Sequence, residues 1–84
     1  MKVTRENIAA ELERLLTERF SVPAEDINPE AHFFNILGLD SVDLLSALAI
    51  LEERHGVSIP DDDLPEMLMF GQCVDRLMKY VETA

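Results

Sequence analysis

Apolar residues recur at intervals of three and four in three separate stretches of this chain, and that periodicity constrains its fold more than any other feature. The stretches run from about Arg5 to Arg19, with Thr4 as the N-cap, from Ser41 to Arg54, and over the region that begins at Phe70. The apolar stripes consist of Ile8, Leu12, Leu15 and Leu16, of Val42, Leu45, Leu48 and Ala49 with Leu44 and Leu51 adjoining, and of Phe70, Cys73, Val74, Leu77 and Val81. Each stretch is therefore predicted to be an amphipathic helix with one face in a core.

The segments between these stretches carry loop signals and one further short helix. Pro23 and Pro29 interrupt residues 21–40, which predicts a long loop held to the core by apolar side chains. A glycine follows His55 as a stop signal for the second helix, and the acidic run after Pro60 predicts a short helix that extends through Met67. The candidate loop anchors are Phe33, Phe34, Ile36 and Leu37.

Together these elements predict an all-α fold, an up-and-down-type bundle of three longer helices and one short third helix. No stretch shows the strict alternation of a half-buried strand. The chain has 84 residues, of which 48% are hydrophobic, and this suffices for one small core but leaves no room for a second. We therefore expect a single domain over residues 1–84.

The formal net charge of −10, from 17 acidic and 7 basic side chains, narrows the classes of partner. A surface of this sign repels nucleic acid and anionic membranes, favours basic protein partners, and helps to keep the chain monomeric. A single cysteine forms no internal disulfide, and no apolar run approaches the ~20 residues of a membrane span. The first residues also lack the apolar core of a signal peptide, so we expect a cytoplasmic protein.

Residues 38–45 place a serine where a loop turns into the second helix. Glycine ends the loop, and Asp40 and Ser41 are both good N-cap residues. Ser41 is thus predicted at a helix N-terminus, where free backbone N–H groups and the helix dipole favour a phosphate by roughly 0.3–1 kcal/mol. For this residue taken alone, a plain helix cap is the more common interpretation.

Three segments around this serine are similar to the acyl carrier protein family. They are Phe33-Phe34-Asn35-Ile36-Leu37-Gly38-Leu39-Asp40-Ser41, Leu51-Glu52-Glu53 and Val57-Ser58-Ile59-Pro60-Asp61-Asp62. The first resembles the loop into the second helix of that family, the next resembles the acidic end of the helix, and the last resembles the segment that follows it. The resemblance covers nearly the whole chain and implies a four-helix acyl-carrier-like bundle.

The resemblance also implies a function and a cofactor. Ser41 matches the serine that carries a covalent 4′-phosphopantetheine arm, which a phosphopantetheinyl transferase takes from coenzyme A. Asp40 matches the acid that supports the Mg²⁺-dependent transfer of the arm. The protein would hold acyl groups as thioesters and deliver them to acyl-transferring, condensing and modifying enzymes of fatty-acid, polyketide or related specialised lipid biosynthesis. In this interpretation the chain is no enzyme and has no catalytic residues of its own.

Partner docking and cargo binding are likewise implied by the resemblance. The docking surface would consist of Asp43, Leu44, Glu52 and Glu53, which would face basic patches on partner enzymes. An acyl-chain pocket inside the bundle would be lined by Leu48, Ile59, Leu64 and Met67. By pattern alone, the acidic residues form a solvated helix face and the apolar residues form a hydrophobic core.

Several residues of the second helix depart from the family pattern. Ser46 stands where fatty-acid carriers commonly have Glu, Arg54 interrupts the acidic end, and His55 replaces a usual aromatic residue. Val42 also replaces the common Leu after the serine, and Leu44 adds an apolar group near the docking face. These differences favour a specialised set of partners over the general fatty-acid synthase.

Other chemical sites are not indicated by the sequence. The segment around Ser41 lacks the glycines of a hydrolase nucleophile elbow, and the acidic run 61–63 lacks the spacing of a calcium loop, so no metal site is predicted. Cys73 lies on an apolar stripe and is expected to be buried. Two alternatives stay open: an aminoacyl or peptidyl carrier that shares the arm, and an unmodified acidic helical interaction module.

Overall fold

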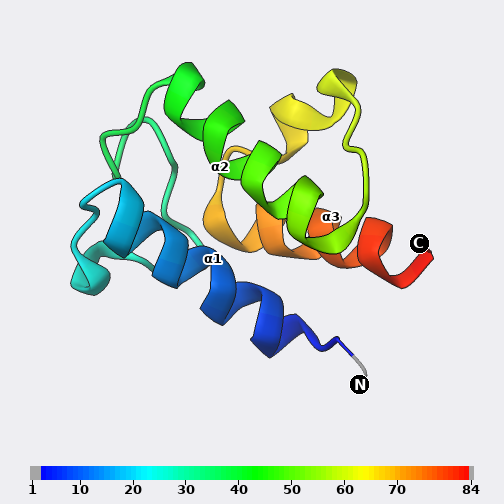
Figure 1. Cartoon of the computed structure of the whole chain (residues 1–84). Coiled ribbons are helices and arrows are strands. Elements are labelled where there is room, and N and C mark those ends of the chain that lie inside the picture. Colours follow the sequence, from blue (N-terminus) through cyan, green and yellow to red (C-terminus); the bar gives the residue numbers. More distant parts are fainter. Residues whose placement is uncertain (1–2, 84) are drawn as a thin grey trace.

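The computed structural model describes residues 3–83, in which helices surround one hydrophobic core (Figure 1). The elements follow in the order α1 (Arg5–Arg19), η1 (Ala24–Asp26), α2 (Ser41–His55), η2 (Asp61–Glu66) and α3 (Phe70–Thr83), where η denotes a 3₁₀-helix. Within these residues there is no strand, and the one β-type pairing is an isolated antiparallel bridge between His32 and Met69. The predicted all-α fold with three longer helices is confirmed. None of the helices in this part of the chain combines the length and hydropathy needed to cross a bilayer.

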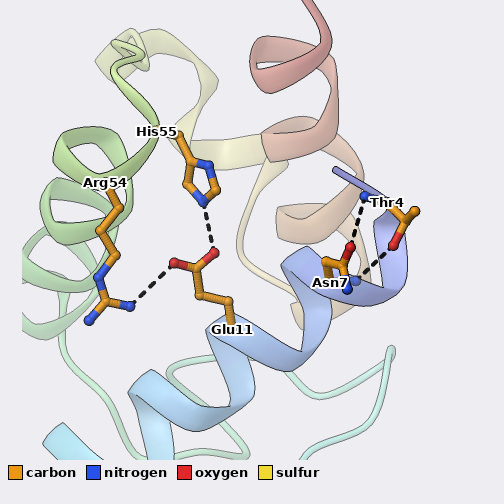
Figure 2. A network of polar contacts seen from close by, with 5 residues as sticks. All are labelled: Thr4, Asn7, Glu11, Arg54 and His55. Atoms are coloured by element: carbon orange, nitrogen blue, oxygen red, sulfur yellow. Dashed lines mark hydrogen bonds and ion pairs between the residues drawn. The ribbon is translucent and has the colours of Figure 1, made fainter. Parts of the chain in front are cut away.

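The two helices α1 and α2 begin with the same reciprocal capping arrangement. At α1, Thr4 Oγ1 accepts the Asn7 N–H at 3.1 Å, and Asn7 Oδ1 accepts the Thr4 N–H at 3.3 Å (Figure 2). At α2, Asp40 Oδ1 accepts the Asp43 N–H at 2.8 Å, and Asp43 Oδ2 accepts the Asp40 N–H at 3.3 Å. Helix α2 ends at Gly56, whose φ of +65° suits a residue without Cβ. These boundaries are set by local chemistry and agree with the predicted starts and stop.

The core is formed by one face of each long helix, and α1 packs against both α2 and α3. The predicted stripe of α1 is fully buried, and so is that of α3 except for the partly buried Val81. For α2 the predicted stripe was wrong in part: Leu48 and the adjoining Leu44 and Leu51 are buried as expected, whereas Val42, Leu45 and Ala49 are exposed and Ala47 is buried instead. Because α2 carries apolar residues on two adjacent faces, its periodicity alone does not determine which face meets the other helices.

The long loop between α1 and α2 is anchored by apolar side chains, as predicted, but not by all of those expected. Phe33 and Leu37 are buried and Phe34 is half-buried, whereas Ile36 is 58% exposed. The expectation that Ile36 folds inward was therefore wrong. Buried side chains at Ala31, Phe33, Leu37 and Leu39 instead connect the loop to the core at intervals along its second half.

Backbone hydrogen bonds also tie this loop to the start of α3. The Phe33 N–H donates to the Leu68 carbonyl at 2.8 Å, and the Phe70 N–H donates to the Ala31 carbonyl at 2.9 Å. At the next residue of α3 the loop and the helix approach so closely that a Cβ on Gly71 would lie 2.9 Å from the carbonyl oxygen of Pro29. The loop is thus a fixed part of the fold, and it holds the start of α2 in place.

The short third helix is a 3₁₀-helix, η2, which ends one residue earlier than predicted. Pro65 lies inside it and has no N–H to donate, which limits regular α-helical bonding in so short a segment. The η2 segment packs Leu64 partly against the core and places Met67, directly after it, fully inside. Figure 1 shows η2 beside α2 in the connection to α3.

A polar contact joins α1 to the C-terminal end of α2. Glu11 Oε2 lies 3.3 Å from Arg54 Nη1, and Glu11 Oε1 lies 2.7 Å from His55 Nε2 (Figure 2). The side chains of Glu11 and His55 are only 24% and 19% exposed, so water screens this contact less than it screens an open surface pair. Arg54 and His55, the two residues that depart from the family pattern here, therefore point toward α1.

Candidate functional site

Ser41 is the first residue of α2, and its hydroxyl is exposed and available. The cap of this helix is Asp40, so the interpretation of Ser41 as a plain N-cap is wrong. Among residues 3–83, Ser41 Oγ has no hydrogen-bond partner, whereas Asp40 and Asp43 bond to each other's backbone. The capping box thus fixes the helix start without using the serine hydroxyl.

The surroundings of Ser41 suit a phosphate ester better than a nucleophile. The first backbone N–H groups of a helix have no intrahelical acceptor, and the helix dipole adds partial positive charge at this end. Within residues 3–83 no His, Asp or Glu side chain hydrogen-bonds to Ser41 Oγ as a general base would. The described residues thus leave the Ser41 hydroxyl exposed at the start of α2 and without a general base beside it.

An apolar cavity of about 250 Å³ opens beside this serine, between α2 and η2. Its walls come from the loop, the first turn of α2, η2 and the residues after η2: Phe34, Ser41, Leu44, Leu45, Leu64, Pro65 and Leu68. Ser41 is the one polar side chain among these lining residues, so it lies at the edge of an apolar space.

The cavity differs from the predicted acyl-chain pocket in most of its lining. Of the four predicted residues, Leu64 lines the cavity. Leu48, Ile59 and Met67 do not line it; they are 3%, 9% and 0% exposed and pack within the core. The sequence did not indicate that Phe34 would line a cavity, because only the folded chain brings the loop beside α2 and η2.

The predicted docking residues also lie in different environments. Leu44 is 3% exposed and belongs to the core and the cavity wall, so its predicted place on the docking face was wrong. Asp43 takes part in the capping box, and the carboxylate of Glu52 accepts the Ile59 N–H at 2.6 Å. Glu53 is exposed, as expected of a docking residue. Among residues 3–83, Glu53 is thus the one of the four that is a surface side chain with no hydrogen bond or ion pair of its own.

The remaining candidate residues have structural roles. Burial raises the pKa of the Cys73 thiol to about 12, which keeps it protonated and unreactive at neutral pH. In the acidic run, Asp63 lies 3.7 Å from Arg76 and accepts a hydrogen bond from the Tyr80 hydroxyl. In the part of the chain that the structure describes, no three His, Cys, Asp or Glu side chains come together as metal ligands.

The chain is similar to known proteins over most of its length. The family described as phosphopantetheine attachment site matches residues 10–81. The acyl carrier protein of Acidothermus cellulolyticus is 32% identical over 84 residues, which is 100% of both chains. That of Helicobacter pylori is 35% identical over 72 residues, covering 86% of this chain and 87% of the other. Among solved structures, the acyl carrier protein from Enterococcus faecalis matches with a TM-score of 0.77 at 22% identity, over 93% of this chain and 99% of that chain, a likeness that bears on the fold alone.

Proposed function

Because this chain belongs to the acyl carrier protein family, we propose that Ser41 is the residue that bears its 4′-phosphopantetheine arm. Acyl carrier proteins are carriers and not enzymes, and phosphopantetheine attachment defines the matched family. The observation that carries the proposal is the position of Ser41, an exposed and unbonded hydroxyl at the first residue of α2 and at the edge of an apolar cavity.

The start of α2 fits the phosphodiester that would link the arm to Ser41. Free N–H groups of the first turn can donate to the phosphate oxygens, and the capping box keeps that turn in place. Asp40 lies next to the serine with a carboxylate that can share a Mg²⁺ ion with the phosphates of coenzyme A during transfer. One carboxylate alone binds Mg²⁺ weakly, so the ion would belong to the complex with the transferase.

The cavity beside Ser41 favours an acyl cargo over an aminoacyl cargo. When attached, the arm supplies a thiol that holds the cargo as a thioester. Hydrocarbon that enters the cavity leaves water with a gain of about 0.8 kcal/mol per buried methylene group. The ammonium group of an aminoacyl cargo would instead lose hydration against an apolar wall that offers no carboxylate. We therefore assign the chain to fatty-acid, polyketide or related specialised lipid biosynthesis.

Intact-protein mass spectrometry tests the attachment. The chain is incubated with coenzyme A and a broad-specificity phosphopantetheinyl transferase, and its mass is compared with that of the untreated chain. Wild type should gain one phosphopantetheine, and so should Ser46→Ala, which removes an exposed hydroxyl elsewhere on the same helix. Ser41→Ala should gain nothing. Modification of Ser41→Ala would place the arm on another residue, and no gain in wild type would favour the unmodified interaction module.

A further inference from the structure

His32 accepts four consecutive backbone N–H groups of the loop before α2. Its ring nitrogen Nδ1 accepts the N–H of Phe34 at 3.1 Å and that of Asn35 at 3.3 Å. Its backbone carbonyl accepts the N–H groups of Ile36 and Leu37 at 3.0 and 3.1 Å. The side chain and carbonyl of His32 together hold this turn as a capping residue holds the first turn of a helix.

The two hydrogen bonds to the ring need a neutral imidazole. Nδ1 accepts a hydrogen bond only through its lone pair, so in this geometry the ring proton is on Nε2. Protonation of Nδ1 makes it a donor and sets it against two N–H groups that also donate. The two bonds to the His32 carbonyl do not involve the ring. A positive charge on the ring therefore loosens the first half of the turn, whereas the second half keeps its acceptor.

The surroundings of the half-buried His32 offer no partner for a charged ring. Among residues 3–83 it takes part in no ion pair, and the residues that it contacts are uncharged: Phe34 and Asn35 in the loop, and Met69 opposite it before α3. The carboxylate nearest in the loop sequence, that of Glu30, is exposed and makes no ion pair with the ring. Protonation thus breaks two hydrogen bonds without gaining an ion pair in return.

The half of the turn that depends on the ring includes a wall of the cavity beside Ser41. Phe34 is the one cavity residue that comes from the loop, and its ring meets that of His32 edge to face, with centroids 5.6 Å apart. The preceding Phe33 is fixed independently, because it is fully buried and its N–H donates to the Leu68 carbonyl. The His32 ring is therefore the polar group through which the loop holds its side chain on the cavity wall.

We propose that His32 is a positioning residue, which holds Phe34 on the cavity wall while its ring is neutral and releases it when the ring is protonated. The consequence for cargo rests on the proposed function, since an acyl group on Ser41 would lose one wall of its apolar cavity. Imidazole is the side chain whose charge ordinarily changes between pH 5 and pH 8. The cavity would therefore shelter an acyl group better at pH 8 than at pH 5.

Amide hydrogen exchange followed by NMR tests this release on the unmodified chain. Protection of the Phe34 and Asn35 N–H groups, relative to unstructured peptide at the same pH, should fall about tenfold between pH 8 and pH 5. The midpoint of this fall should coincide with the titration of the His32 ring protons. Protection of the Leu37 N–H, whose acceptor is the His32 carbonyl, should change by less than about twofold.

Three variants separate the charge of His32 from its structural role. His32→Asn keeps a side-chain acceptor for the turn but does not titrate, so protection of the Phe34 and Asn35 N–H groups should stay level over the pH range. His32→Ala lacks the acceptor and should give low protection at both pH values. His55→Asn removes the other histidine of the chain and should leave the wild-type profile unchanged. Circular dichroism of each variant confirms that the helices are retained.

Two outcomes of the exchange measurement overturn the proposal. One is protection of Phe34 and Asn35 that does not change in wild type as His32 titrates. The other is a fall in His32→Asn that matches the fall in wild type. If His55→Asn abolishes the fall, the effect belongs to the contact between His55 and Glu11, which also overturns the proposal.

The consequence for cargo is measured on chain that the transferase has loaded from hexanoyl-coenzyme A. Nuclear Overhauser contacts between the acyl methylene protons and the Phe34 ring should be weaker at pH 5 than at pH 8 in wild type, and equal in His32→Asn. Equal contacts at both pH values in wild type would overturn the role of His32 in sheltering cargo. A chain that takes up no acyl group contradicts the proposed attachment at Ser41, while the exchange measurement, which needs no arm, still decides the role of His32.

Discussion

Asp40 combines two roles that a pair of substitutions can separate. Its side chain accepts the Asp43 N–H at 2.8 Å and its own N–H donates to Asp43 at 3.3 Å, so it fixes the first turn of α2. Its negative charge is the feature that would support Mg²⁺ during attachment of the arm to Ser41. An Asn at this position keeps a side-chain oxygen that can cap the helix but lacks the charge.

The effect of these substitutions on stability depends on whether the cap of α2 is lost. Asp40→Ala leaves the Asp43 N–H without its acceptor, and loss of an N-cap costs about 0.5–2 kcal/mol. For a domain of this size, each 1 kcal/mol lowers Tm by roughly 4–8 °C. Asp40→Asn should change the free energy of unfolding by less than about 0.5 kcal/mol, because Asn and Asp are similarly good caps.

Thermal denaturation followed by circular dichroism measures the effect on stability. The initial rate of mass gain with coenzyme A and the transferase measures the effect on attachment of the arm. We expect Asp40→Ala to lose both stability and transfer rate, and Asp40→Asn to keep its Tm while losing transfer rate. Equal loss of Tm in both variants would refute the role of the capping hydrogen bond. A wild-type transfer rate in Asp40→Asn would refute the role of the charge.

Two further predictions concern the core. Burial raises the pKa of Cys73 from 9.0 to about 12, so the thiol loses its proton at lower pH in the unfolded chain than in the folded chain. The free energy of unfolding should therefore fall as the pH rises from 9.0 to about 12. Relative to Cys73→Ala, the fall should approach about 1.4 kcal/mol per pH unit in urea titrations, and parallel pH profiles would contradict it. Gly71→Ala should lower the free energy of unfolding by about 1–3 kcal/mol, because its Cβ would lie 2.9 Å from the Pro29 carbonyl oxygen. Gln72→Ala, at the exposed neighbouring position, should change the free energy of unfolding by less than about 0.5 kcal/mol. Equal denaturation midpoints of the two variants would show that the loop shifts to accommodate the added Cβ and would contradict this prediction.

Features set by local chemistry could be predicted from the sequence. Thr4 begins α1 and Gly56 ends α2, because capping and left-handed backbone depend on residues only a few positions apart. The stripes of α1 and α3 were identified correctly, since the large apolar side chains of each stripe lie on the face that meets the core. Cys73 was expected inside for the same reason, and it is fully buried.

Features set by the packing of distant segments could not be predicted in this way. Leu44 was expected near the docking surface, but in the folded chain it is buried and forms part of the cavity wall between α2 and η2. Phe34 lines the cavity only because backbone bonds hold the loop against the start of α3. Glu11 lies more than forty residues from Arg54 and His55 in sequence, and no local pattern connects them.

Tandem mass spectrometry of the chain isolated from the cells that naturally make it tests most directly whether this protein carries acyl groups on Ser41. We predict a fragment in which Ser41 bears 4′-phosphopantetheine, with an acyl thioester on part of the molecules. An arm on any other residue, or a chain that remains unmodified in those cells, would contradict the assignment of Ser41. An amino acid in place of the acyl group would keep the arm at Ser41 and contradict the acyl cargo.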